Sequence, residues 1–205
     1  NKGDDQRAMR HIVEASALNP DSSLLKTQLL LFQCKLGEVE AETLEDAKRN
    51  MRFNRYSAYV YENLEMLAGR VFGKGCKGLG AKELNELIDA ALANPGSTLI
   101  PGLRQDMQYL KGIVALFDGK VRDAVDRFEQ SLRLVPRVEL AVQIAAVLAT
   151  HGKFLEALAF LDEAESLAAA DSGGSVRGTV RRLARDYPTE IARLRSQINK
   201  DLGTR

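Results

Sequence analysis

The sequence predicts an all-α fold, an α-solenoid built from stacked antiparallel helix pairs. Apolar residues recur at intervals of three and four along most of the 205 residues, and only five prolines interrupt them. A two-helix pattern also recurs after about 33 residues in the C-terminal half. Because a single helix pair cannot bury its own apolar face, we expect neighbouring pairs to stack.

Two consecutive units, 104–136 and 138–169, carry the pattern most clearly. In the first unit the marker positions are Gly112, Gly119, Ala124, Phe128, Leu132 and Pro136. In the second unit they are Ala145, Gly152, Ala157, Leu161 and Glu165. Small residues let two helix backbones approach closely, and glycine can adopt the positive φ of a tight turn. We therefore expect Gly112 at a helix crossing and Gly119 in a turn.

Less regular helices are predicted before these units. They cover 8–18, 22–36, 43–51, 56–73 and 84–92. Ser22 or Asp21 can cap the second of these helices, Gly37 ends it, and Thr43 is the expected cap of the third. The glycine-rich stretch 73–80 is predicted to be a loop.

The C-terminal half is predicted to contain two helix pairs and a tail. The pairs cover 104–118 with 120–134, and 138–150 with 153–169. A break is expected at 171–174, followed by helices over 175–186 and 188–201, with Pro188 in a first turn. The predicted domains are therefore a helical repeat domain, 1–170, and C-terminal capping helices, 171–205.

The marker residues resemble the tetratricopeptide repeat family. Its units place small residues at the helix crossing, glycine in the turn, alanine and an aromatic residue in the second helix, and proline at the end. The positions that match are Gly112, Gly119, Ala124, Phe128, Ser131 and Pro136. The next unit departs from the pattern, since it lacks the proline and has Leu161 in place of the aromatic residue. The resemblance implies a right-handed solenoid that acts as a non-enzymatic scaffold for a protein or peptide partner.

A second resemblance concerns the context of the chain. Segments 108–112, 145–152 and 190–195 are similar to the helical tails of bacterial O-antigen polymerase- or ligase-like membrane proteins and related glycosyltransferases. This resemblance implies a periplasmic domain whose partner is the membrane-embedded part of its own longer chain. Without it, the cytoplasm is the expected compartment.

The tetratricopeptide resemblance also implies where a partner binds. The first helices of such pairs line a concave groove, and the corresponding positions here are Tyr109, Ile113, Leu116, Phe117, Val142, Gln143, Ala146 and Ala149. Family members that clamp a carboxylate use lysine and asparagine at such positions, which this chain lacks. A largely apolar groove suits an amphipathic helix or an extended peptide, or the chain's own tail.

A basic stripe offers a third hypothesis. Lys48, Arg49, Arg52 and Arg55 are interleaved with aromatic residues, which is a pattern of RNA-binding helical repeats. The alternative is a solvated helix face whose charges pair with nearby carboxylates. The formal net charge is only +1, so nucleic acid is not the expected partner.

We expect no catalytic residues, no bound cofactor and no metal site. The letters Gly73-x-Gly75-x-x-Gly78 match a dinucleotide fingerprint, but a helix precedes them where the fingerprint needs a strand. His11 and His151 lie far apart, and His151 is placed to contact helix-end carbonyls. Cys34 and Cys76 lack CxxC spacing, so free thiols are expected, with a disulfide left open.

Overall fold

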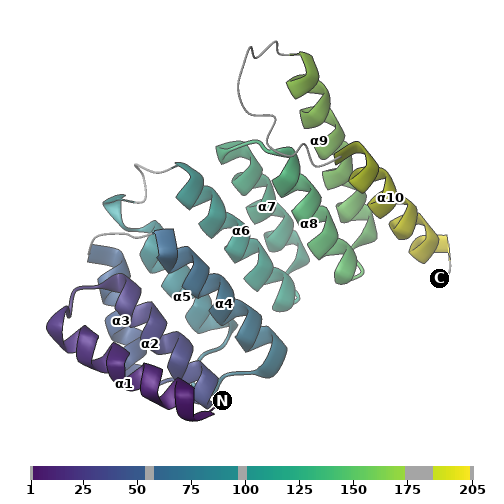
Figure 1. The fold of residues 1–205 in the computed structure, drawn as a ribbon. Helices are drawn as coiled ribbons and strands as arrows, with labels where there is room; N and C mark the ends of the chain where they lie inside the picture. The colour runs from purple at the N-terminus through teal and green to yellow at the C-terminus, as the bar shows by residue number, and fades with distance from the viewer. Residues whose placement is uncertain (1, 54–57, 97–100, 174–186, 204–205) are drawn as a thin grey trace. The chain divides into compact units, whose positions relative to one another are not determined.

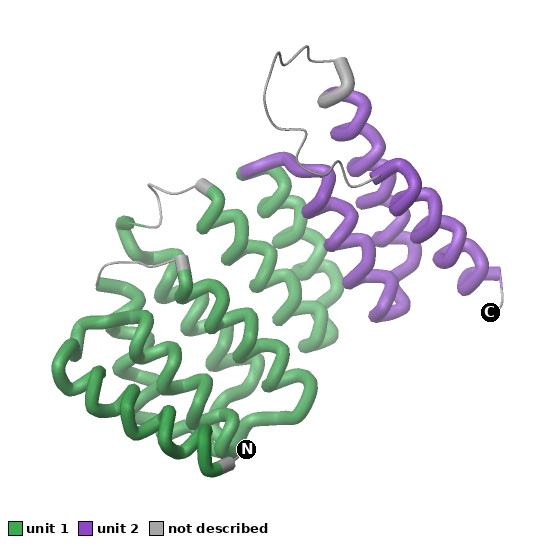
Figure 2. Tube along the Cα trace, in the orientation of Figure 1, with its two compact units in different colours: residues 1–134 green, residues 135–205 purple. Residues whose placement is uncertain are grey.

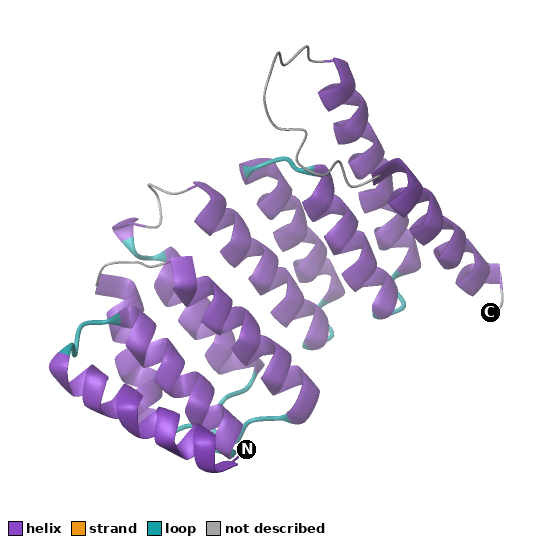
Figure 3. Cartoon of the chain, viewed as in Figure 1, coloured by secondary structure: helices purple, strands orange, loops and turns teal. Residues whose placement is uncertain are grey.

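The computed structural model describes residues 2–53, 58–96, 101–173 and 187–203. Within these ranges the chain is built of helices joined by turns and loops, and no β-strand is formed (Figures 1 and 3). Contacts divide the chain into two compact units, residues 1–134 and 135–205 (Figure 2). The predicted all-α class is confirmed. The predicted domain boundary at residue 170 and the right-handed course of the solenoid stay predictions. Among the described helices, none combines the length and the hydropathy needed to cross a membrane.

The first unit consists of two layers of helices. Its helices are α1 (Lys2–Leu18), α2 (Ser23–Leu36), α3 (Ala41–Phe53), α4 (Ala58–Lys74), α5 (Ala81–Leu92), α6 (Pro101–Phe117) and α7 (Val121–Leu134). Consecutive helices α2–α3, α4–α5 and α6–α7 form pairs, and the first members of neighbouring pairs touch, α2 with α4 and α4 with α6 (Figure 1). The second members α3 and α5 also touch. This arrangement is a helical repeat of stacked pairs.

Glycine ends the first helix of three pairs with the same hydrogen-bond pattern. Gly37, Gly119 and Gly152 have φ of 116°, 76° and 68°. After α6, the amide of Gly119 donates to the carbonyl of Leu116, and the amide of Lys120 donates to the carbonyl of Ala115. The same two bonds follow α2 and α8. Left-handed glycine is the residue that this helix end requires, so the predicted turn positions are confirmed.

Gly112 lies at a helix crossing, as predicted. A Cβ atom added to it would lie well under 3.0 Å from the ring of Phe128, which is fully buried. One turn further along α7, the hydroxyl of Ser131 donates to the carbonyl of Gln105 at 2.9 Å. The small residues of the repeat therefore let α6 and α7 pack closely.

The core of the first unit is apolar and continuous from α2 to α6. Its fully buried members include Leu30, Met51, Leu64, Leu84 and Leu110. Two buried amides cross between helices or chain segments. Asn63 donates to the hydroxyl of Thr27 at 3.0 Å, and Asn94 donates to the carbonyl of Met51 at 2.7 Å. These bonds satisfy polar groups that would be costly to bury alone.

The second unit contains one helix pair and a capping helix. These are α8 (Val138–Thr150), α9 (Phe154–Gly173) and α10 (Tyr187–Gly203). Ala145 and Ala157 are fully buried, and α10 packs on α9 and α8. Arg195 of α10 contacts the carboxylates of Asp162 and Glu165 at 2.7 and 3.1 Å. The burial of Ile191 and Ile198 gives α10 an apolar contact face, as expected of a cap.

The first helix begins at Lys2, six residues before its predicted start, and one predicted start signal and one predicted break are wrong. Thr43 does not cap α3, which begins at Ala41; its buried hydroxyl instead accepts a hydrogen bond from the side chain of Gln33 at 3.1 Å. Gln33 also accepts from the amide of Glu40, so a side-chain network stabilises this start. The predicted break at 171–174 is wrong for 171–173, where α9 continues. The predicted helix over 175–186 lies outside the described residues.

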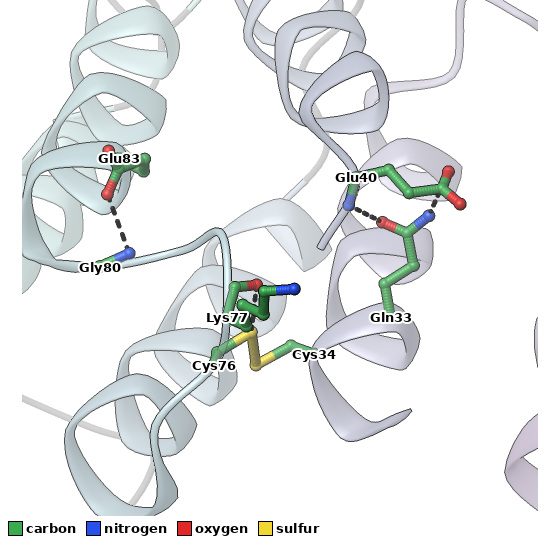
Figure 4. Close-up of a disulfide and its surroundings, with 7 residues drawn as sticks. All are labelled: Gln33, Cys34, Glu40, Cys76, Lys77, Gly80 and Glu83. Atoms are coloured by element: carbon green, nitrogen blue, oxygen red, sulfur yellow. Dashed lines mark hydrogen bonds between the residues drawn. A yellow bond between two sulfur atoms is a disulfide. The ribbon is translucent and has the colours of Figure 1, made fainter. Parts of the chain in front are cut away.

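The loop between α4 and α5 is held against the turn between α2 and α3. The amide of Val39 donates to the carbonyl of Lys77 at 2.8 Å, and the amide of Lys77 donates to the carbonyl of Gly37 at 3.2 Å. Cys34 and Cys76 are joined in a disulfide with Cα atoms 5.3 Å apart (Figure 4). The expectation of free thiols is therefore wrong, because this loop returns to the preceding turn and brings the two cysteines together.

Candidate functional site

The face where α4 and α6 lie side by side is the best candidate for a binding site within the first unit. We define the α4/α6 face by Glu62, Glu65, Phe72, Tyr109, Ile113 and Phe117. Residues 109, 113 and 117 follow each other at four-residue spacing, which places them on one side of α6. The opposite sides of both helices supply buried core residues such as Leu64 and Leu110. The face is thus the less buried side of each helix, although Phe72 also packs against the core.

A stacked aromatic pair connects the C-terminal ends of the two helices. The rings of Phe72 and Phe117 lie with centroids 4.3 Å apart and planes 2° from parallel. Phe117 nevertheless keeps 46% of its surface exposed. A large apolar side chain held in place yet accessible to solvent is what an anchoring contact with another protein requires.

The N-terminal halves of the two helices carry carboxylates. Partial burial raises the pKa of Glu65 above its ordinary value, and the carboxylates of Asp106 and Glu62 raise it further. Burial, together with the charge of Glu65, raises the pKa of Tyr109 to about 12. These charge interactions connect Glu65 of α4 with Asp106 and Tyr109 of α6. The α4/α6 face is therefore acidic at one end and aromatic at the other.

The structure separates the predicted groove residues into accessible and buried ones. In the first unit, Tyr109 and Ile113 are half-buried and Phe117 is exposed, but Leu116 is buried. In the second unit, Gln143 is exposed and Ala146 and Ala149 are half-buried, whereas Val142 is buried. Leu116 and Val142 are thus not presented to a ligand, because they point into packed surroundings. The groove as a whole, which draws on both units, stays a prediction.

Sequence reasoning missed Glu62, Glu65 and Phe72. The signal was present: if Ala68 corresponds to Gly112, then Glu65 takes the position of Tyr109. By the same register Glu62 corresponds to Asp106.

Two of the four residues in the predicted basic patch, Lys48 and Arg49, contact carboxylates of the same chain. Lys48, with only 17% of its side chain exposed, contacts both Glu45 and Glu86. Burial lowers the pKa of Lys48, but hydrogen bonds with these two carboxylates outweigh it and hold the pKa above its ordinary value. Arg49 lies 3.4 Å from Asp46.

The other two residues of the predicted patch are Arg52 and Arg55. Arg52 is exposed, and Arg55 lies outside the described residues. The structure gives no support to an RNA-binding surface here, since Lys48 and Arg49 are already engaged with carboxylates of the same chain.

A hollow with a volume of about 280 Å³ lies between α5, α6 and α7. Its lining residues are Asn85, Asp89, Lys111, Ala115, Lys120, Asp123, Asp126, Arg127 and Gln130. Lys111 forms an ion pair with Asp89 across it, and Arg127 donates to Gln108 at 3.2 Å. Its three acidic and three basic side chains give the hollow no net charge, so it would not favour an anionic or a cationic ligand.

The histidines do not assemble a chemical site. His11 is exposed on α1 beside Glu14, at 3.5 Å. The Nδ1 atom of His151 lies 2.9 Å from the carbonyl of Val147, at the C-terminal end of α8, as its position in the sequence predicts. Across the described ranges, no three His, Cys, Asp or Glu side chains gather as metal ligands would.

Comparison with known proteins finds a distant structural likeness. No protein-family model matches the sequence. No curated protein matches it either. The structure is similar to the crystal structure of MamA, with 16% sequence identity and a TM-score of 0.43, over 83% of this chain and 92% of that chain. The helical-repeat architecture therefore rests on the helix pairs, turns and crossings of the chain itself.

Proposed function

We propose that the chain is a non-enzymatic scaffold that binds a peptide or helix of another protein on the α4/α6 face. The observation that carries this proposal is the stacked pair Phe72–Phe117, which is fixed in position while Phe117 stays accessible. In stacked helix pairs the first helices present the free surface on which extended peptides and amphipathic helices can lie.

Selection of peptides from a displayed random library against the purified chain tests this function. Selected peptides should bind the Phe117→Ala variant at least about ten-fold more weakly, as expected when an anchoring aromatic is truncated. Leu155→Ala is the matched control, because Leu155 is exposed to 73% but lies on α9 in the other unit. Equal affinity for wild type and Phe117→Ala, with both folded by circular dichroism, would overturn the proposal.

The disulfide supports a second, related proposal about the compartment. Disulfides persist in oxidising environments and are rare in the cytosol. The bond between Cys34 and Cys76 therefore favours action outside the cytosol, and in the bacterial periplasm if the chain is part of a glycan-handling membrane protein. In that case its partner is the membrane-embedded part of the same protein.

Thiol alkylation before and after reduction tests the compartment. The chain would be sampled from cells that export it and from cells that retain it in the cytosol. Exported chain should react with two equivalents of maleimide only after reduction, and it should resist protease better than retained chain. Equal protease resistance of the oxidised and reduced forms would contradict a role of the disulfide in the working protein.

A further inference from the structure

The α4/α6 face is polarised along its length. Phe72 and Phe117 meet at the C-terminal ends of their helices, while Glu65 interacts with Asp106 and Tyr109 nearer the N-terminal ends. The two helices therefore run in the same direction. At 1.5 Å rise per residue, Glu65 and Phe72 are separated by roughly 10 Å along α4. One end of the face is thus negative, and the other is aromatic.

Two carboxylates of the negative end, Glu62 and Glu65, carry the charge that a partner would meet. Within the part of the chain that the structure describes, Glu62 and Glu65 form no ion pair, although both keep part of their surface accessible to solvent. By contrast, exposed carboxylates elsewhere, such as Glu86 and Glu129, do pair with a lysine or an arginine. Glu62 and Glu65 repel each other at three-residue spacing on one helix.

The surface between the two ends is open. Gly69 lies on α4 between Glu65 and Phe72, and a Cβ atom added there would meet nothing within 4 Å. The absence of a side chain at this position lets the backbone of a bound segment lie against the helix. An extended segment could therefore contact both ends of the face at once.

We propose that the α4/α6 face binds an extended peptide segment with a lysine or arginine at one end and a large apolar residue about three positions away. This inference rests on the proposed function and adds the chemistry of the partner. The cation would lie against Glu62 and Glu65, and the apolar side chain against Phe72 and Phe117. In the polyproline II conformation three residues span roughly 9 Å and bring the side chains at their two ends to the same side, which matches the separation of the two ends of the face. Charge complementarity sets both the orientation and the sign of the partner.

Four fluorescent ten-residue peptides test the proposal by polarisation. One carries arginine and phenylalanine three positions apart, one has glutamate in place of arginine, one has alanine in place of phenylalanine, and one has glutamine in place of arginine. The first should bind tightest, by at least about ten-fold over the glutamate peptide. Its affinity should fall between 50 and 200 mM salt, because its cation lies at an exposed site.

Isosteric variants locate the binding charge. The double variant Glu62→Gln/Glu65→Gln should lose the preference for arginine over glutamine. The control Glu42→Gln/Glu163→Gln removes the same charge from exposed positions on α3 and α9 and should retain the preference. If the preference survives in the first variant, or if the glutamate peptide binds as well as the arginine peptide, the inference is wrong.

The same measurements distinguish a failure of the basic-partner inference from a failure of the proposed scaffold function. If Phe117→Ala weakens all four peptides equally and no charge preference exists, the scaffold function stands and the basic partner is excluded. If no peptide depends on Phe117, the binding face itself is wrong. Circular dichroism of each variant confirms that it is folded.

Discussion

The ring of Phe128 on α7 occupies the space that a side chain on Gly112 of α6 would need. Gly→Ala within a helix ordinarily stabilises by about 0.5–1 kcal/mol. Here the added methyl group would displace a fully buried ring, and overpacking of this kind costs about 1–3 kcal/mol. We expect Gly112→Ala to lower the free energy of unfolding, measured by urea denaturation.

Gly69→Ala is the matched control for this prediction. Gly69 also lies inside a helix, but an added Cβ there meets nothing within 4 Å. It should therefore raise the free energy of unfolding by about 0.5–1 kcal/mol. Equal effects of the two substitutions would show that the crossing of α6 and α7 tolerates a side chain.

Reduction of the disulfide should destabilise the first unit. The bond between Cys34 and Cys76 closes a loop over a sequence separation of 42 residues. Removing such a constraint costs about 2–4 kcal/mol through the entropy of the unfolded chain. Urea unfolding with and without dithiothreitol measures the difference. The Cys34→Ala/Cys76→Ala variant should match the reduced protein and should not respond to dithiothreitol, and a response would contradict the assignment.

The attachment of the α4–α5 loop depends on Gly78 more than on Gly75. Both have positive φ, of 81° and 76°, which costs a non-glycine residue about 1–2 kcal/mol. A Cβ on Gly78 would also collide with the carbonyl oxygen of Val39, whereas one on Gly75 meets nothing within 4 Å. Gly78→Ala should therefore lower the midpoint of urea unfolding more than Gly75→Ala. Equal midpoints would mean that the loop is not held against Val39.

The turns and crossings were predictable from the sequence because each depends on a local steric requirement. Gly119 and Gly152 occupy left-handed helix ends, and Gly112 meets a ring only 16 positions away along the chain. The disulfide was not predictable, because its formation depends on a loop returning to a turn 42 residues earlier. The spacing of the two cysteines in the sequence does not indicate that the loop and the turn meet.

The candidate site was predictable only in part. Tyr109, Ile113 and Phe117 follow from the repeat register of α6, and their accessibility agrees with the prediction. The acidic end depends on which residues of α4 lie beside α6, and this is a property of two packed helices. Start signals are similarly ambiguous: Thr43 has the chemistry of a cap, but Gln33 engages it inside α3.

Glu86 should contribute to stability in a way that is lost in acid. Its hydrogen bond with Lys48 lowers the pKa of its carboxyl below the ordinary 4.5. A carboxyl with a lowered pKa in the folded state stabilises above the unfolded-state pKa and loses this contribution as the pH falls through its folded value. Glu86→Gln should thus lower Tm slightly at pH 7, by less than about 3 °C, because the Glu86 carboxylate is partly accessible to solvent. The difference from wild type should close below pH 4.5, and a constant difference would contradict the ion pair.

The contribution of Glu65 to stability should depend on pH in the opposite sense to that of Glu86. Partial burial, with Asp106 and Glu62, raises its pKa above 4.5, so its ionised form disfavours the folded state. Protonated Glu65 therefore contributes stability to the folded state at pH values below its unfolded-state pKa. This contribution is lost as the pH rises through its folded-state pKa. Glu65→Gln should therefore raise Tm at pH 7 by about 1–2 °C, the size expected for relief of like-charge repulsion. The gain should vanish below pH 4.5, where the wild-type carboxyl is protonated.

Glu163→Gln, at an exposed position of α9, is the control and should leave Tm unchanged at both pH values. A fall in Tm on replacing Glu65 would mean that a cation of the chain already occupies the acidic end of the face.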